Sequence, residues 1–499
     1  MNCIGIIAEY NPFHKGHEHQ LKELAKRYPD ALRLVVMSGS FVQRGEPALF
    51  DKFTRARWAL LNGAHAVIEL PTVYATANAE RFAAGGVRLL HRLGARALAF
   101  GTETEDASLL QKIARLSLSS TVQTACREAL KKGEFYGTAL RQAIITECPD
   151  AAAIVNQPNA LLGLEYTKAI HQYGLAMNII PILREGEHHS DKLASNWPSG
   201  TALRRQIRNL DALTDFPSTD NVSPYISANL QGEYKESVES GAYSDLARYY
   251  DLVLYESRKQ GAAQLEALAD FKEGLHQIWT SVSQKASWPE AREQLKSKRY
   301  SYARLDRMAS YTVLGITREL QNEAHTEGPQ YARLLGFTDE ARPWLQRKEF
   351  TVPLIQKWAP FINTASGLTA ELAALDQRAT DIQKLCLTNP IKRQGGEDFY
   401  FTPWYIKKKC FIVLYCCYDV KKYTYQKDIA KIRQCPFICH QPKLPAIIIF
   451  SILRNSNAIF PVLLFNIYAH GFHMRCRNIF PHIIGANRQF AVSSVNEYG

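Results

Sequence analysis

The first 210 residues alternate between short apolar runs and amphipathic helical segments, and no other feature limits the fold as strongly. Five apolar runs predict buried strands, over residues 3–8, 31–37, 66–70, 95–100 and 176–183. Helical patterns separate them, over residues 16–27, 52–62 and 78–93. Strands that alternate with helices form parallel sheets covered on both faces. The pattern therefore predicts an α/β fold with a doubly wound parallel sheet, in which ligands bind beyond the carboxyl ends of the strands.

The remaining sequence differs from this segment in two ways. Beyond about residue 210 the strand signal fades, and apolar residues recur at helical spacing up to about residue 385. From Lys407 onward the chain has 13 Lys and Arg but only 3 Asp and Glu, and it holds six of the ten cysteines. We therefore predict a catalytic domain over residues 1–210, a mainly α-helical domain over 211–406 and an atypical basic, cysteine-rich tail over 407–499. Three readings of the tail stay open: an RNA-binding appendage, a zinc site, or an unevolved extension that packs poorly.

Composition narrows the class of protein. A hydrophobic content of 46% supports a packed core, and the net charge of +12 indicates an anionic partner. The first residues lack a basic segment and Glu9 interrupts a short apolar run, so we expect no signal peptide. No apolar stretch reaches the roughly 20 residues of a membrane-spanning helix. The cysteines before the tail follow no disulfide framework. We expect a soluble protein of the reducing cytoplasm.

The strongest local motif is EYNPFHKGH at residues 9–17, where the first predicted strand becomes the first predicted helix. His14 and His17 are three residues apart, so they share a helical face. Gly16 has no side chain and lets a phosphate approach the backbone. A helix N-terminus favours anions, and two imidazoles there can donate to phosphoryl oxygens. The alternative is a pair of polar histidines that only cap the helix.

A wider set of motifs resembles the bacterial tRNA(Met) cytidine acetate ligase family. The motif HKGH at 14–17 also resembles the His-x-Gly-His signature of the larger nucleotidylyltransferase superfamily. The ordered family motifs are AEYNPFHKGH at 8–17, SGSFVQRGEPA at 38–48, DK at 51–52, VIELP at 67–71, FGTE at 100–103, PNALLGLEY at 158–166 and REG at 184–186. The resemblance continues at 299–307, 335–337 and 376–381 and covers roughly residues 1–406.

The resemblance implies a two-step reaction. Acetate and ATP give acetyl-adenylate and pyrophosphate, and the acetyl group then passes to N4 of the wobble cytidine of elongator tRNA(Met). It implies that Mg²⁺ accompanies ATP, and the sequence predicts no dedicated metal site. Catalytic roles fall on His14, Lys15 and His17, which suit the charge that builds on pyrophosphate. The implied ATP-binding residues are Ile7, Ala8, Glu9, Tyr10, Asn11, Pro12, Phe13, His14, Lys15, Gly16, His17, Glu18, His19, Gln20, Gly101, Asn159 and Arg184.

Several of these residues have simpler readings. Gly101 can be a turn glycine, Asn159 a helix N-cap and Arg184 a surface arginine. The segment SGTALR at 199–204 resembles a second phosphate-binding signature, but a plain capped helix has the same spacing.

Binding of tRNA requires clustered basic residues. The candidates are Arg204, Arg205, Arg208, Lys296, Lys298, Arg299, Arg304 and Arg307, with Tyr300 and Tyr302 as stacking partners for an exposed base. The alternative is a solvated basic helix face.

Two other functions stay open at this stage. One is a nucleotidylyltransferase that adenylylates a small phosphorylated metabolite. The other is a non-catalytic RNA-binding protein with a vestigial nucleotide fold. The intact histidine motif argues against the second, and the long helical region argues against the first.

Overall fold

The computed structural model describes residues 2–134, 136–184, 199–209, 222–297, 299–347 and 350–407, and four strands beyond them. The chain forms two compact units, a main unit Met1–Ile406 and a C-terminal unit Lys407–Gly499. The predicted domain boundary near residue 210 lies outside the described residues.

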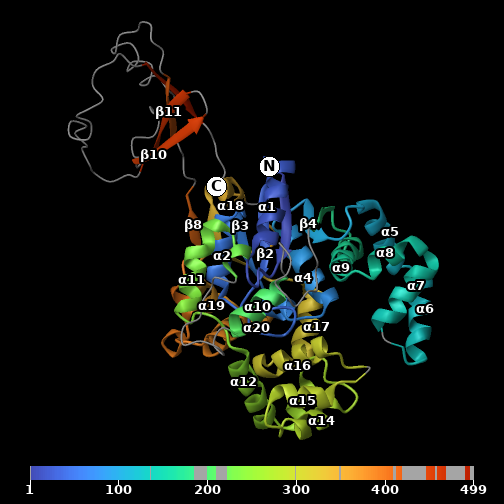
Figure 1. Cartoon of the computed structure of the whole chain (residues 1–499). Helices are drawn as coiled ribbons and strands as arrows, with labels where there is room; N and C mark the ends of the chain where they lie inside the picture. The colour runs from blue at the N-terminus through green and yellow to red at the C-terminus, as the bar shows by residue number, and fades with distance from the viewer. Residues whose placement is uncertain are drawn as a thin grey trace. The chain divides into compact units, whose positions relative to one another are not determined.

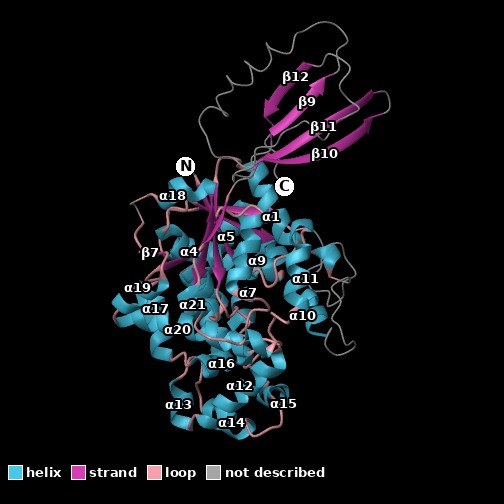
Figure 2. Ribbon diagram, turned by 90° about the vertical axis from the view of Figure 1, so that its left-hand side faces the viewer, coloured by secondary structure: helices cyan, strands magenta, loops and turns pink. Residues whose placement is uncertain are grey.

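A mixed, mainly parallel sheet runs through the main unit with helices on both sides (Figure 2). Its first five strands are β1 Cys3–Ala8, β2 Leu32–Ser38, β3 Ala66–Leu70, β4 Ala97–Thr102 and β5 Asn178–Leu183. They are parallel in the order β5-β4-β1-β2-β3. The chain thus winds outward from β1 in both directions, which confirms the predicted doubly wound sheet.

Alternate residues of β1 show why both faces are covered. Ile4 and Ile6 belong to one buried cluster, which includes residues of the first two helices, whereas Cys3 and Ile7 belong to the other. At Gly5 the backbone is so close to a helix that an added Cβ would lie 2.6 Å from Leu90 Cδ1. A continuous apolar run therefore becomes a central strand because neither face meets water.

Three strands from the last part of the main unit's sequence complete the sheet. They are β6 Ala332–Thr338, β7 Leu354–Ile355 and β8 Trp404–Ile406. Strand β6 pairs antiparallel with β3, and β7 and β8 each pair parallel with β6. The prediction of helix throughout this region is therefore wrong at β6. A seven-residue segment in which only the central residues are apolar fits a buried helix equally well, and only its pairing with β3 decides the outcome.

Helices make up most of the rest of the main unit (Figure 1). The first ten are α1 Lys15–Arg27, α2 Lys52–Leu61, α3 Thr72–Ala75, α4 Ala79–Arg92, α5 Ala107–Ser117, α6 Ser120–Lys131, α7 Tyr136–Glu147, α8 Ala152–Val155, α9 Pro158–Gln172 and α10 Gly200–Asn209. The others are α11 Gln231–Glu239, α12 Leu246–Lys259, α13 Ala262–Ala267, α14 Leu275–Val282, α15 Trp288–Leu295, α16 Tyr302–Leu314, α17 Arg318–Glu327, α18 Arg342–Leu345, α19 Trp358–Thr364, α20 Gly367–Leu385 and α21 Glu397–Tyr400. Helices α5–α8 form an insertion between β4 and β5, which we call the insertion lobe.

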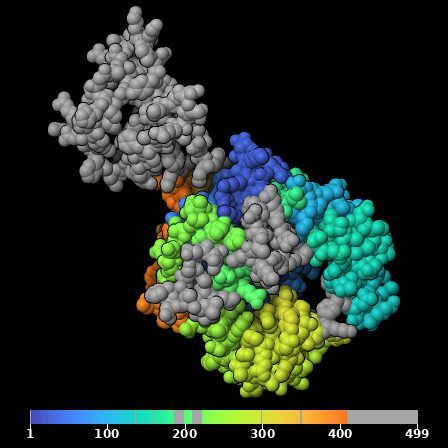
Figure 3. Space-filling view, viewed as in Figure 1, coloured from blue at the N-terminus to red at the C-terminus, as the bar shows by residue number. Residues whose placement is uncertain are grey.

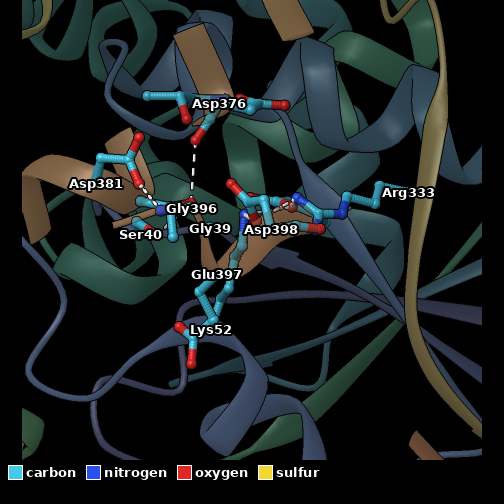
Figure 4. A network of polar contacts seen from close by, with 12 residues as sticks. Gly39, Ser40, Lys52, Arg333, Asp376, Asp381, Gly396, Glu397 and Asp398 are labelled. Carbon is cyan, nitrogen blue, oxygen red and sulfur yellow. Dashed lines mark hydrogen bonds and ion pairs between the residues drawn. The ribbon is translucent and has the colours of Figure 1, made fainter. Parts of the chain in front are cut away.

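A buried network of charges ties the late elements to the sheet (Figure 4). Lys52 Nζ lies 2.8 and 2.9 Å from the two Glu69 carboxylate oxygens and 2.9 Å from Asp398 Oδ1. Arg333 donates to Asp398 Oδ1 over 2.6 Å and to Glu69 Oε2 over 3.3 Å. All four side chains are at least 96% buried. Two cations thus balance two carboxylates across α2, β3, β6 and α21, and losing one partner would leave a buried charge uncompensated.

Asp376 of α20 lies beside this network. Its carboxylate accepts the Thr72 backbone N–H over 2.7 Å and the Tyr331 hydroxyl. Burial and the nearby charge of Glu69 raise the pKa of Asp376 to about 7. Farther along α20, the Gln383 amide donates to a backbone carbonyl of the loop between β2 and α2 over 2.7 Å. Helix α20 therefore supports the loop that follows β2.

The C-terminal unit contains one antiparallel sheet in the order β10-β11-β9-β12. Its strands are β9 Ile412–Cys417, β10 Ala446–Asn455, β11 Ala458–Ile467 and β12 Gln489–Ser494. The three readings of the tail remain predictions, because its side chains lie outside the described structure. Within the described residues, no helix is both long and apolar enough to span a membrane.

Candidate active site

A cavity of about 830 Å³ opens at the carboxyl ends of β1, β4 and β5. This volume lies in the usual range for small-molecule sites. Residues 7–11 at the end of β1 form one wall, and the first turns of α1 and α10 meet at the same cavity. Helix N-termini favour anions, so two of them at one cavity suit a phosphate ligand.

The chain leaves β1 through a tight turn at Tyr10, whose φ is 46°. This left-handed conformation is rare for a bulky residue and marks a strained turn. The buried Tyr10 ring holds the turn from within, 5.0 Å from the Phe13 ring and 4.8 Å from the His17 ring. Aromatic packing beneath the turn therefore places the histidine motif at the end of β1.

His14 and His17 form a reciprocal cap at the start of α1. His14 Nδ1 accepts the Gly16 N–H over 3.0 Å, and His17 Nδ1 accepts the His14 N–H over 3.3 Å. The two rings stack with their centroids 3.9 Å apart. Because each Nδ1 is an acceptor, each neutral ring carries its proton on Nε2. The cap thus leaves two Nε2–H donors on residues that line the cavity.

Both histidines are neutral at physiological pH. Burial and the charges of Arg184 and Arg204 lower the pKa of His14 to about 3. Burial, His14 and Arg184 lower the pKa of His17 well below its usual value. The rings can therefore donate hydrogen bonds to an anion, and the positive charge of the site comes from the arginines.

Two arginines supply that charge. Desolvation at the cavity wall lowers the pKa of Arg184, while the charge of Glu103 acts in the opposite direction. An added Cβ at Gly101 would lie 3.1 Å from Arg184 Cγ, so the glycine makes room for this side chain. Arg204 donates to the Asn11 carbonyl over 2.7 Å and lies 3.1 Å from Glu46 Oε1. Both guanidinium groups belong to residues of the cavity wall.

Arg55 of α2 links the carboxyl ends of β1 and β2 through hydrogen bonds to their backbone carbonyls. Its guanidinium donates to the carbonyls of Glu9 over 2.6 Å and of Ser38 over 3.0 Å, and also to the Gly39 carbonyl. The Glu9 carboxylate in turn accepts the Gln43 N–H over 2.8 Å. These bonds fix the loop after β2 against the histidine segment, so the wall is preorganised.

Comparisons with known proteins agree with this geometry. A family model described as HIGH Nucleotidyl Transferase matches residues 1–398. A tRNA(Met) cytidine acetate ligase of Thermosipho africanus is 33% identical over 366 residues, which are 71% of this chain and 84% of that protein. One from Syntrophomonas wolfei is 33% identical over 419 residues, 81% of this chain and 99% of that protein. The chain belongs to the tRNA(Met) cytidine acetate ligase family.

A solved structure supports the same assignment. The crystal structure of Thermotoga maritima TmcAL bound with alpha-thio ATP has a TM-score of 0.74 and 28% identity to this chain. It covers 82% of this chain and 100% of its own. The family resemblance and the α/β fold class expected from the sequence are therefore confirmed.

The structure brings together most of the family-implied ATP residues. The cavity is lined by Ile7, Ala8, Glu9, Tyr10, Asn11, His14, Gly16, His17, His19, Gln20, Gly101 and Arg184. It does not bring Pro12, Phe13, Lys15 or Glu18 into the lining. Lys15 is half-exposed in the first turn of α1, and Glu18 forms an ion pair with Lys22 over 2.6 Å. Asn159 lies in the first turn of α9, where Gln157 is the N-cap, and its side chain is outside the described residues.

Position 16 requires a glycine for a different reason from the one that the motif predicts. Its N–H donates to the His14 ring, and an added Cβ would lie 2.9 Å from His14 Cε1. The space left by the missing side chain therefore accommodates an imidazole. The segment at 199–204 does open a helix, because Ser199 Oγ accepts the Ala202 N–H over 3.1 Å, and Ser199 also lines the cavity.

The predicted basic candidates occupy varied surroundings. Arg204 is buried in the cavity wall, and Arg208 lies 3.5 Å from Glu46 and donates to the Ser244 carbonyl. Arg304 stacks on Tyr300, with 4.5 Å between the guanidinium carbon and the ring centroid, and pairs with Asp270 over 3.4 Å. Lys298 lies outside the described residues. Their roles in tRNA binding stay predictions.

Sequence reasoning missed several polar residues of the cavity. Arg44 follows β2 and Arg141 belongs to α7. Glu80 and Glu165 also line the cavity, and both pair with the buried Lys168, at 3.3 and 2.9 Å respectively. Arg44 and Glu165 lie within motifs of the family, whereas Arg141 and Glu80 carry no local signal. Only the tertiary fold brings α7 to the cavity.

Proposed function

We propose that the chain is an ATP-dependent ligase that activates acetate and acetylates N4 of the wobble cytidine of elongator tRNA(Met). Family membership supports this assignment, and the observation that carries it is the stacked, neutral histidine pair at the cavity. In the first step, an acetate oxygen attacks the α-phosphorus of ATP, and the bond to pyrophosphate breaks. In the second, the cytidine N4 attacks the acetyl carbonyl, AMP leaves and N4 loses one proton.

The donors at the cavity suit the first step. The Nε2–H groups of His14 and His17 can bind oxygens on which charge develops, and such donors stabilise the transition state without rearranging. Arg184 and Arg204 would neutralise the phosphates. The amide Nδ2 of Asn11, which also lines the cavity, is buried and has no partner within the described structure, so it is available to a ligand. We assign ATP binding to this donor set and infer that Lys15, which is not among the lining residues, acts through its charge.

Magnesium would arrive bound to ATP. In the part of the chain that the structure describes, no three His, Cys, Asp or Glu side chains gather as a metal site. The role assigned to the protein's own residues is positioning and hydrogen bonding. Because ATP and tRNA are cytoplasmic, we infer that the chain works in the cytoplasm.

The deciding experiment is ATP–pyrophosphate exchange with and without acetate, followed by incubation with tRNA(Met) that carries an unmodified wobble cytidine. We expect exchange that depends on acetate, and N4-acetylcytidine in the digested tRNA. Exchange without acetate, or a stable adenylylated small molecule as the product, would favour a nucleotidylyltransferase and overturn the proposal.

A further inference from the structure

Two further arginines line the cavity besides Arg184 and Arg204. Arg44 is exposed, Arg141 is half-exposed, and both line the cavity. Within the described residues neither guanidinium has a hydrogen bond or an ion pair, and Arg141 Nε is shielded from solvent without a partner. An arginine without a counterion at a cavity rim is placed for an anionic ligand.

Their positions in the fold put them on two sides of the histidines. Arg44 follows β2, which pairs with one edge of β1, and Arg141 lies in the insertion that follows β4, which pairs with the other edge. The histidine motif itself follows β1. The two arginines therefore flank the chemical centre from opposite sides.

The loop that carries Arg44 is held firmly. The Gly45 N–H donates to the Val42 carbonyl over 2.9 Å, and the Tyr249 hydroxyl donates to the Gly45 carbonyl over 2.9 Å. Gly45 has a φ of 78° and touches the backbone of α16 so closely that a Cβ would clash. The turn thus presents the Arg44 side chain from a fixed backbone, which lowers the entropy lost on binding.

The second reaction step needs the wobble base inside the cavity. Its N4 must reach an acetyl group formed beside His14 and His17, so the nucleotide must be turned out of its stack and inserted. The phosphodiesters on either side of that nucleotide then remain at the rim. Figure 3 shows a hollow between the insertion lobe and the lobe of α12–α16, where a large partner can approach.

We propose that Arg44 and Arg141 form a clamp on the tRNA phosphodiesters that flank the inserted wobble cytidine. This inference rests on the proposed function. The competing assignment is that both arginines bind the triphosphate of ATP. Arg184 and Arg204 act electrostatically on the histidine pair, whereas Arg44 and Arg141 are not among the groups that do so. Arg44 is close enough to Arg204 for its charge to lower the pKa of Arg204, so exchange without tRNA is the measurement that separates the two assignments.

The test compares R44A, R141A and the double variant with wild type and with R96A. Arg96 is an exposed arginine just before the amino end of β4, at the edge of the sheet away from the cavity. Binding of tRNA(Met) is measured over a range of salt concentrations, and acetate-dependent exchange is measured without tRNA. We expect about tenfold weaker tRNA binding for each lost contact, and a salt slope smaller by roughly 0.7–0.9 per contact.

The controls separate the possible outcomes. Exchange without tRNA should stay within about twofold of wild type, R44K should recover part of the affinity, and R96A should match wild type. A double variant with unchanged tRNA affinity and salt slope would overturn the clamp. A double variant that loses exchange would instead assign both arginines to ATP. If wild type itself shows no acetate-dependent exchange, the proposed function fails, and this outcome is distinct from failure of the clamp.

Discussion

Replacing His14 by Asn separates the two tasks of this side chain. The Oδ1 of Asn stands where Nδ1 of the imidazole stands, so it can still accept the Gly16 N–H and keep the cap. It cannot replace the Nε2–H. We expect acetate-dependent exchange to fall about 10²–10³-fold, the loss of about 2.7–4 kcal/mol that follows removal of one oxyanion donor. H14A should lose the same rate and, without a cap, unfold about 1 kcal/mol more easily than H14N.

The assay is pyrophosphate exchange at saturating ATP and acetate, with urea unfolding of both variants and tRNA binding as controls. Binding of tRNA should stay near wild type, because the ring acts at the phosphates. Since the pKa of His14 is about 3, wild-type exchange should show no titration of this side chain between pH 6 and 8. If H14N kept full exchange while H14A lost stability, His14 would be a helix cap only, and the catalytic reasoning would be refuted.

Three further predictions concern stability. Because His14 and His17 are neutral in the folded chain, the unfolded chain binds more protons below pH about 6.5. The free energy of unfolding should therefore fall below that pH by about 1.4 kcal/mol per pH unit for each histidine; a flat profile in urea titrations between pH 4 and 6.5 would contradict this. K52M should lower the free energy of unfolding in urea by about 3–5 kcal/mol, because it leaves two buried carboxylates with one cation. K22M, which removes an exposed pair, should lower it by under about 0.5 kcal/mol. Equal losses for the two variants would argue against the network. G45A should destabilise by at least about 1 kcal/mol, because the residue has a positive φ and its Cβ would meet the backbone of α16; an unchanged melting temperature would show that the loop adapts.

The sequence predicts the parallel strands β1 to β5 well, but it does not predict β6, which extends the sheet beyond β3. The predicted strands at 3–8 and 66–70 match β1 and β3 residue for residue, since apolar runs that end at polar or proline residues are reliable strand signals. Strand β6 escapes detection because its length fits a buried helix turn and its partner is remote in sequence. The stabilising pairing is a tertiary contact that local periodicity does not encode.

The candidate site also has a part that the sequence predicts and a part that it does not. The motif and its place after β1 are sufficient to predict the histidine pair as phosphate ligands, which remains a proposal. They do not reveal that each Nδ1 is used in a cap, which follows only from the turn geometry at Tyr10 and Gly16. Arg141 could not be predicted from the sequence, because α7 carries no motif and reaches the cavity only through the packing of the insertion lobe against α9.

The pairing of β3 with β6 also has a consequence for synthesis on the ribosome. Glu69 and Arg333, which meet in the buried charge network, are 264 positions apart. At roughly 5–20 residues per second, about 13 to 50 s pass between the emergence of one and of the other. During that interval β3 is an open edge whose backbone groups can pair with other chains, and the cation that completes the network has not been made. The nascent first half therefore depends on being kept apart from its neighbours until the last third of the main unit arrives.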